Sequence, residues 1–205
     1  MEEGEVITSA KPSLPIRISR LKEDKMKPIG ALMREHRLIE RMIGLLDAEL
    51  KQMTEKNEAN IDLLTTATDF LRTYADRTHH GKEEDILFRD LAKKQLSEDH
   101  MRVMYELTAE HTFARSLVTS LVNAGKAYAT GNPDSLKDIM AGINEVVRFY
   151  PMHIQKEDKN FFYLAQEYLS KKEQDDMLDE FWEFDRGLIH EKYEQIVKNL
   201  ESRKS

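Results

Sequence analysis

Two ten-residue segments of this chain carry nearly the same pattern of side chains that could do chemistry. Residues 79–88 are HHGKEEDILF and residues 153–162 are HIQKEDKNFF. Both have a histidine, a lysine three residues later, acids at four and five residues, and apolar residues at eight and nine. On a helix, a histidine and a glutamate four residues apart project from one face, so each segment can direct an imidazole and a carboxylate at one point. This pairing indicates metal binding, and two copies indicate two metal ions or one site with two-fold pseudo-symmetry.

Two lone histidines extend the repeat. His36 precedes His79 by 43 residues, and His111 precedes His153 by 42 residues. A single histidine on an apolar helical face is usually a hydrogen-bonded core residue, but four at matching depths of an up-down bundle would converge on its axis, where bundles build metal centres. A glutamate directly precedes each lone histidine, at Glu35 and Glu110. These two point about 100° away on a helix, which favours roles beside the metal ligands or at the surface.

The first segment holds a competing pair with the same spacing, His80 and Glu84. Alignment of the two segments on their lysines and their final apolar residues favours His79 with Glu83 instead. That choice matches His153 with Glu157 in the second segment.

Helices must position these side chains, because apolar residues recur at helical spacing and strand-like alternation is absent. The first helix begins at Pro28 and fades at 54–57, and the second carries the first segment and ends before Ser97. Three more are expected at about 98–129, 134–168 and 171–202. We therefore predict an all-α fold, an antiparallel up-down four-helix bundle with an additional C-terminal helix packed on it. The expected divisions are an extended or partly disordered arm (1–26), the bundle (27–168) and the C-terminal helix (169–205).

Composition restricts the chemistry. The 205 residues include no cysteine, so any metal must be held by nitrogen and oxygen ligands. The net charge of -7 provides no basic footprint, and we expect no nucleic-acid partner. The chain has no stretch approaching the roughly 18 apolar residues of a membrane span, and its first residues have no apolar leader core, so we expect a soluble, cytoplasmic protein.

Four motifs in order, REHRLIERMI, HHGKEEDILF, EHTFARSL and HIQKEDKNFF, resemble those of the hemerythrin-like family, also called the HHE cation-binding domain. The resemblance covers about residues 28–168. It implies an antiparallel four-helix bundle around a non-haem di-iron centre that meets dioxygen or related diatomic molecules. The ligands that it implies are His36, His79, Glu83, His111, His153 and Glu157, with Glu83 and Glu157 bridging the two metals.

One departure from the family concerns the third helix. Oxygen-carrying hemerythrins have two histidines one turn apart there, whereas Leu107 and Arg115 flank His111 in this chain. A centre with four rather than five of the family's histidines keeps more positions open for water or substrate, which favours redox turnover over reversible carriage. Two residues could restore a ligand or instead hydrogen-bond to one, His80 and Glu40.

The sequence thus predicts two iron ions with an oxo or hydroxo bridge, with manganese and zinc as alternatives. The expected function is binding or reduction of dioxygen, peroxide or nitric oxide, in detoxification, sensing or transport, with an electron donor as partner. The alternative is an iron- or oxygen-responsive regulatory module, in which a partner reads a surface at Phe181, Trp182 and Phe184; ordinary packing competes with that role. Enzyme against carrier, the cellular metal and the oligomeric state stay open.

Overall fold

A computed structural model describes residues 27–185 and 189–203 of the chain. The predicted arm at 1–26 lies outside these residues. Every regular element within the described ranges is helical, and they contain no strand. The prediction of an all-α class is confirmed.

The helices follow one another with short connections. The first is α2 (Pro28–Lys56). A second continuous segment, residues 61–91, comprises α3 (Ile61–Phe70), η1 (Leu71–His80), η2 (Glu83–Phe88) and α4 (Arg89–Leu91). The third is α5 (Glu98–Ala129). A fourth continuous segment, residues 135–168, comprises α6 (Ser135–Lys156), η3 (Glu157–Phe161), α7 (Phe162–Ala165) and η4 (Gln166–Tyr168). Two shorter helices end the described chain, α8 (Lys171–Phe184) and α9 (Ile189–Ser202).

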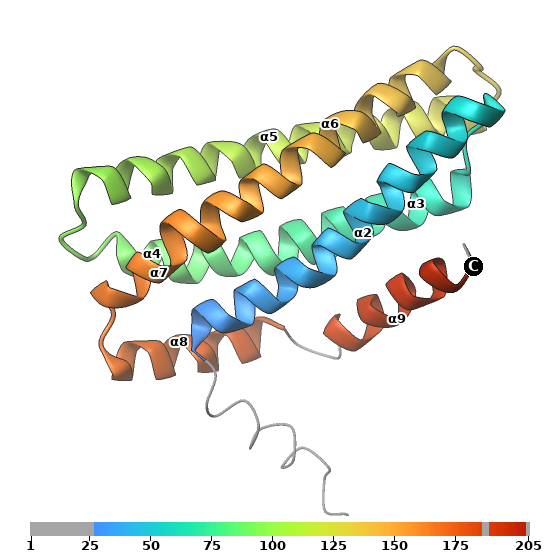
Figure 1. Cartoon of the computed structure of the whole chain (residues 1–205). Helices are drawn as coiled ribbons and strands as arrows, with labels where there is room; N and C mark the ends of the chain where they lie inside the picture. The colour runs from blue at the N-terminus through green and yellow to red at the C-terminus, as the bar shows by residue number, and fades with distance from the viewer. Residues whose placement is uncertain (1–26, 186–188, 204–205) are drawn as a thin grey trace, which may run out of the picture.

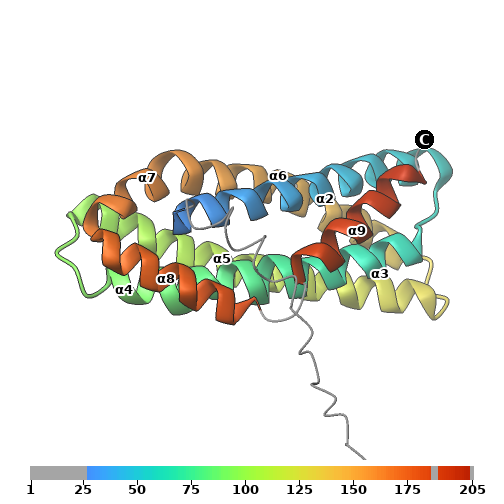
Figure 2. The ribbon, with the colours of Figure 1, turned by 90° about the horizontal axis from the view of Figure 1, so that it is seen from below.

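The four long segments lie side by side, and α8 and α9 lie outside them (Figures 1 and 2). The helix α6 packs against α5 and α2, while α3 packs against α5. The helices α8 and α9 both contact α2, and α8 also contacts η2. The C-terminal helices therefore cover the side of the bundle formed by the first two segments.

Local sequence explains where the helices begin and end. Pro28 occupies the first turn of α2, where its missing N–H is not needed. The side chains of Asn60 and Ser97 accept hydrogen bonds from backbone N–H groups in the first turns of α3 and α5. Ser170 and Glu173 form a reciprocal capping box at the start of α8. The predicted helix starts at Pro28, after Ser97 and after Ser170 agree with the structure, because each has a local start signal.

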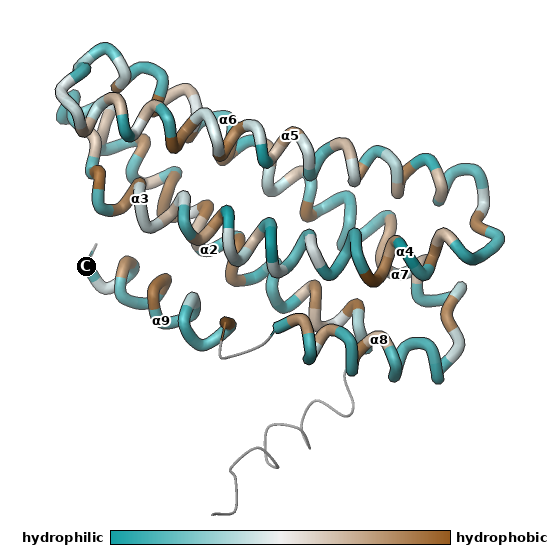
Figure 3. Tube along the Cα trace, turned by 180° about the vertical axis from the view of Figure 1, so that it is seen from behind, coloured by the Kyte–Doolittle hydropathy of each residue, from teal (hydrophilic) through white to brown (hydrophobic). Residues whose placement is uncertain are grey.

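The interior consists of two apolar clusters with a polar layer between them (Figure 3 shows the alternation of apolar and polar residues along the helices). Along α2, Leu32 belongs to one cluster, Ile39 to the other, and His36 lies between them. The same order recurs along α5, where His111 separates Leu107 from Ala114. The repeated segments therefore place their polar residues at one depth of an otherwise apolar core.

Three stretches of the second and fourth segments, η1, η2 and η3, are π-helical. A π-helix bonds residue i to i+5, so a turn takes more residues than in an α-helix and successive side chains diverge by less than 100°. These stretches contain His79, His80, Glu83 and Glu157. The π-helical turn is wider than the 3.6-residue α-helical turn from which the side-chain directions were predicted.

The prediction of a single C-terminal helix at 171–202 is wrong. The described residues of this range form two helices, since α8 ends at Phe184 and is followed by a turn at Asp185, and α9 spans Ile189–Ser202. Phe181 is buried in the core, whereas Trp182 and Phe184 are 46% and 39% exposed. Of the two roles that the sequence offered for Phe181, packing in the core and recognition by a partner, its burial therefore supports packing.

Among the described residues, we find no helix with the length and apolar character needed to span a membrane. The longest, α5, has buried residues on one face and charged residues on the other. Its pattern is that of a helix packed in a bundle.

Candidate metal centre

Four buried side chains form the first of two groups in the polar layer. His36 comes from α2, His79 from η1, Glu83 from η2 and Glu157 from η3. Each offers one ligand atom, and these atoms lie within 4.8 Å of one another. Imidazole nitrogen and carboxylate oxygen are ligands suited to iron, manganese or zinc.

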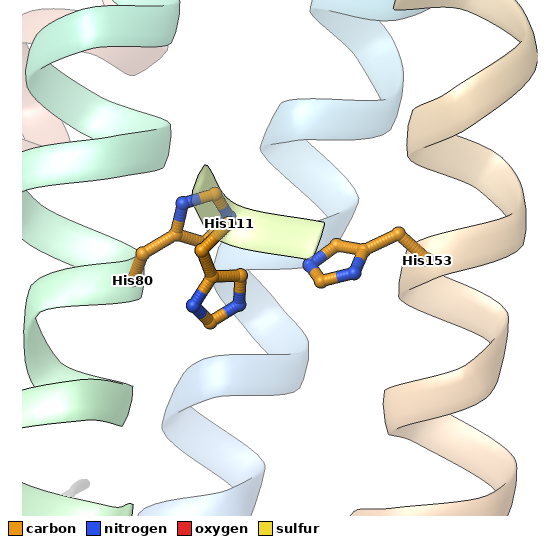
Figure 4. A group of neighbouring side chains, drawn as sticks. All are labelled: His80, His111 and His153. Carbon is orange, nitrogen blue, oxygen red and sulfur yellow. The ribbon is translucent and has the colours of Figure 1, made fainter. Parts of the chain in front are cut away.

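Three histidines form the second group: His80, His111 and His153. All three are buried, and their ligand atoms also lie within 4.8 Å of one another. Figure 4 shows the rings gathered in the space between the helical segments. The rings of His80 and His111 stack with their centroids 3.9 Å apart.

The carboxylate of Glu83, a member of the first group, lies between a histidine of that group and a histidine of the second. Its Oε1 is 3.4 Å from Nε2 of His79, in the first group. Its Oε2 is 3.3 Å from Nε2 of His111, in the second. Each oxygen thus faces a different group, the arrangement needed for a bridging carboxylate.

Glu157 has the same disposition. Its Oε2 is 3.1 Å from Nε2 of His36 in the first group. Its Oε1 is 3.4 Å from Nε2 of His153 and 3.5 Å from Nε2 of His111 in the second. The two glutamates are completely buried and both span the groups.

The other ring nitrogen of four of these histidines contacts an acid. The Nδ1 distances are 2.7 Å from His36 to Asp158, 2.9 Å from His79 to Glu35, 2.7 Å from His111 to Glu84 and 2.8 Å from His153 to Glu110. Such a carboxylate favours the tautomer with the proton on Nδ1, which leaves the lone pair of Nε2 available to bind a metal. Glu35 and Glu110 therefore lie beside candidate ligands, one of the two roles that the sequence favoured for them.

Several buried atoms in this layer make no hydrogen bond to any residue that the structure describes. They are Nε2 of His36, His79 and His153, Nδ1 of His80, both oxygens of Glu83, and Oε2 of Glu157. Leaving such atoms unpaired costs roughly 1–3 kcal/mol each, and more for charged groups. Atoms of this kind, turned toward one another at ligand spacing, fit a bound metal cation.

The electrostatics show how strongly the layer attracts positive charge. Burial alone would lower the pKa of His36, but its contacts with Asp158 and Glu157 raise it to about 10. Burial alone would raise the pKa of Glu157, yet the neighbouring histidines hold it well below its usual value. Without a metal, Asp158 and Glu157 therefore favour the protonated form of His36.

His80 behaves differently from His36. Burial, together with repulsion from His111, His153 and His79, holds the pKa of His80 well below its ordinary value. The ring is consequently neutral, as a metal ligand must be.

A buried carboxylate supports the first group from outside. Burial would raise the pKa of Glu35, but the ammonium of Lys82 and the hydrogen bond with His79 lower it to about 2. Glu35 is therefore an ionised acceptor for the Nδ1–H of His79.

The structure brings together all six side chains that the sequence put forward as ligands and adds His80 to them. Glu40 is in neither group, because its side chain is 40% exposed and lies 3.2 Å from Arg37. Glu84, the rejected partner of His80, instead holds Nδ1 of His111. The sequence left His80 open between a ligand and a hydrogen-bonding neighbour of one, because an α-helical period places consecutive residues about 100° apart.

A buried layer of imidazoles and carboxylates inside an all-helical bundle defines a cation-binding helical protein. More specifically, the chain belongs to the hemerythrin HHE cation-binding family, since the model of the hemerythrin HHE cation binding domain matches residues 27–165. No curated protein and no solved structure matches the chain. The helices α8 and α9 lie beyond the residues that the family model matches.

Proposed function

We propose that this is a non-haem di-iron protein that binds or reduces dioxygen, peroxide or nitric oxide. The observation that carries this proposal is the placement of Glu83 and Glu157, each with one oxygen toward each histidine group. Two carboxylates in this position suit a pair of cations better than a single one. Iron is proposed because the nitrogen and oxygen donors suit it and because of the resemblance of the four motifs to the family's.

The ligand sets of the two metals would differ. His36 and His79 would hold the first metal, and the second would be held by His80, His111 and His153. With both glutamates bridging, the first metal would have four protein ligands and the second five. An octahedral ion at the first site therefore keeps more positions for a small ligand. Bound iron would supply the site for that ligand and the electrons for its reduction.

The surroundings select the kind of molecule that reaches this layer. Apolar side chains on one side of it are completely or almost completely buried, including Leu32, Leu87, Leu107 and Phe162. They restrict water and ions but allow a small neutral molecule to dissolve among them. This favours a diatomic molecule or peroxide over a large organic substrate.

The proposal includes the arrangement of the bundle. We propose that the four long segments form the antiparallel up-down four-helix bundle expected from the sequence, with α8 and α9 packed outside it. The short connections at 57–60, 92–97 and 130–134 support this arrangement, because they leave room only for neighbouring helices of opposite direction.

The test is the reaction of the iron-loaded, reduced protein with oxygen. A persistent adduct that disappears when oxygen is removed would establish carriage. Rapid oxidation of the iron, with consumption of added peroxide, would establish turnover. Iron that neither binds oxygen nor is oxidised faster than free iron would contradict the proposal. Nitric oxide is added in a parallel experiment with the same readouts.

A further inference from the structure

Each of the two repeated segments takes part in a triad of a lysine, a glutamate and a histidine. The two triads differ in how far they are exposed to solvent. Lys82 donates to Glu35, which contacts Nδ1 of His79, and Lys156 donates to Glu110, which contacts Nδ1 of His153. In the first triad the lysine and glutamate side chains are 0% and 5% exposed. In the second they are 29% and 26% exposed. Only the first triad is therefore enclosed. From the repeat in the sequence alone, the two triads would be expected to be equally buried.

The group that encloses the first triad comes from the C-terminal part of the chain. Asp185, directly after α8, accepts hydrogen bonds from Nζ of Lys82 at 2.8 and 2.9 Å. The ring of Phe181 lies 5.5 Å from the same ammonium. Lys82 thus contacts two carboxylates and an aromatic face, which compensates for burial of its charge.

Asp185 is itself held in place. Its Oδ2 lies 2.9 Å from Nε2 of His190 in α9, and Nδ1 of that ring lies 3.0 Å from the hydroxyl of Tyr74. These contacts tie Asp185 to both the bundle and the last helix. The position of the carboxylate over Lys82 is therefore fixed from two sides.

A glycine in the first repeat makes room for α8. A Cβ atom on Gly81 would lie only 2.8 Å from Cζ of Phe184. The equivalent position in the second repeat is Gln155, which is exposed. A glycine at this position thus fits the close approach of Phe184 in the first repeat, an observation independent of the ion pairs.

We propose that Asp185 and Lys82 are positioning residues for His79, through which the C-terminal helices make one metal of the proposed pair more tightly held than the other. Asp185 orients the ammonium of Lys82, Lys82 orients Glu35, and Glu35 orients the imidazole of His79. The second triad has no such cover and serves as an internal comparison. This inference rests on the proposed function, because it concerns retention of a metal at the first group.

The test uses the full chain loaded with cobalt(II), whose release to an excess of chelator is followed by absorbance. Asp185→Asn removes the charge while keeping the size of the side chain, and we expect one of two release phases to accelerate by roughly tenfold or more. Asp185→Glu should restore most of the slow phase. A control in the second triad, Lys156→Met, should change release by less than about threefold, because its ion pair is partly exposed.

A second measurement separates positioning from general stability. In the metal-free protein, the Nδ1–H of His79 is expected to be visible by NMR as a slowly exchanging proton. Asp185→Asn should speed its exchange while leaving that of His153 nearly unchanged, whereas a general loss of stability would speed the exchange of both protons. Equal release and equal exchange in Asp185→Asn and in the unmodified protein would overturn the inference. A chain that binds no cobalt or iron would instead defeat the proposed function, and the exchange measurement would still decide the positioning role.

Discussion

At the scale of single residues, the layer owes its properties to the use of both ends of each imidazole. His36, for example, has Nδ1 fixed by Asp158 and Nε2 turned toward Glu157. An acid at Nδ1 makes the opposite nitrogen a better and better-oriented donor. The sequence indicated the histidines, Glu83 and Glu157, and it favoured places beside the ligands or at the surface for Glu35 and Glu110. Each acid contacts an imidazole of another helix, so the pairing could be assigned only from the folded structure.

His80 provides the first residue-scale prediction. It stacks on His111 in the second group, so His80→Ala should reduce bound iron from two ions per chain to about one. Loss of a ligand and of a buried neutral ring is the physical reason. Metal analysis after anaerobic loading provides the measurement, with Glu40→Gln as a control because Glu40 lies on the surface. Full occupancy in His80→Ala would remove this histidine from the ligand set.

The second residue-scale prediction concerns pH. In the metal-free protein the pKa of His36 is about 10, above its ordinary value of 6.5. Its proton therefore stabilises the metal-free fold fully below pH 6.5, and this contribution is lost as the pH rises through about 10. A metal must displace that proton, so affinity should rise between pH 7 and 9 by about tenfold per pH unit for each proton released. Affinity that does not change over this range, measured together with proton release, would contradict the account.

At the scale of elements, the helix ranges could be predicted from the sequence, whereas the π-helical stretches could not. The helix ranges followed from periodicity and caps because those signals are local. The side chains of both His79 and His80 point inward because the turn of η1 is wider than an α-helical turn. No residue type in η1 indicates such a wide turn from the sequence. The division of the C-terminal segment into α8 and α9 was missed for a related reason, since its apolar stripe continues through both helices.

The attachment of α9 provides an element-scale prediction. Val197 is completely buried in the main core, whereas Arg41 forms partly exposed ion pairs with Glu194 and Glu201. Val197→Ala should lower the free energy of unfolding by roughly 2 kcal/mol through lost apolar contact and a small cavity. Arg41→Ala should lower it by less than about 1 kcal/mol. Urea denaturation of both variants decides, and the reverse order would show that charge rather than packing holds α9.

At the scale of the whole molecule, the polar layer lies between two apolar clusters and connects all four long segments. Ligands from four segments mean that bound metal crosslinks the bundle, so metal should stabilise the folded state. Iron at a hundred times its dissociation constant would add about 2.7 kcal/mol per site. Calorimetry with and without iron should show the increase, and identical unfolding midpoints would contradict it.

The alternative function, an iron- or oxygen-responsive regulatory module, can also be tested on the whole molecule. Trp182 is the only tryptophan in the sequence, lies on α8 and is 46% exposed. A module read by a partner at this surface requires a metal-dependent change there. We expect the fluorescence of Trp182 to change little on iron binding, because α8 is anchored by buried Met177 and Phe181. A large spectral shift would favour the regulatory function.

The most direct test of the central claim is the number of metal ions bound by the purified full chain after anaerobic reconstitution with iron(II). Two ions per chain are predicted, together with the near-ultraviolet charge-transfer absorption of a coupled iron pair after oxidation. Glu157→Ala should lower the count for both positions, since this carboxylate faces both histidine groups. A chain that retains no iron, or a single iron unaffected by Glu157→Ala, would contradict a dinuclear centre.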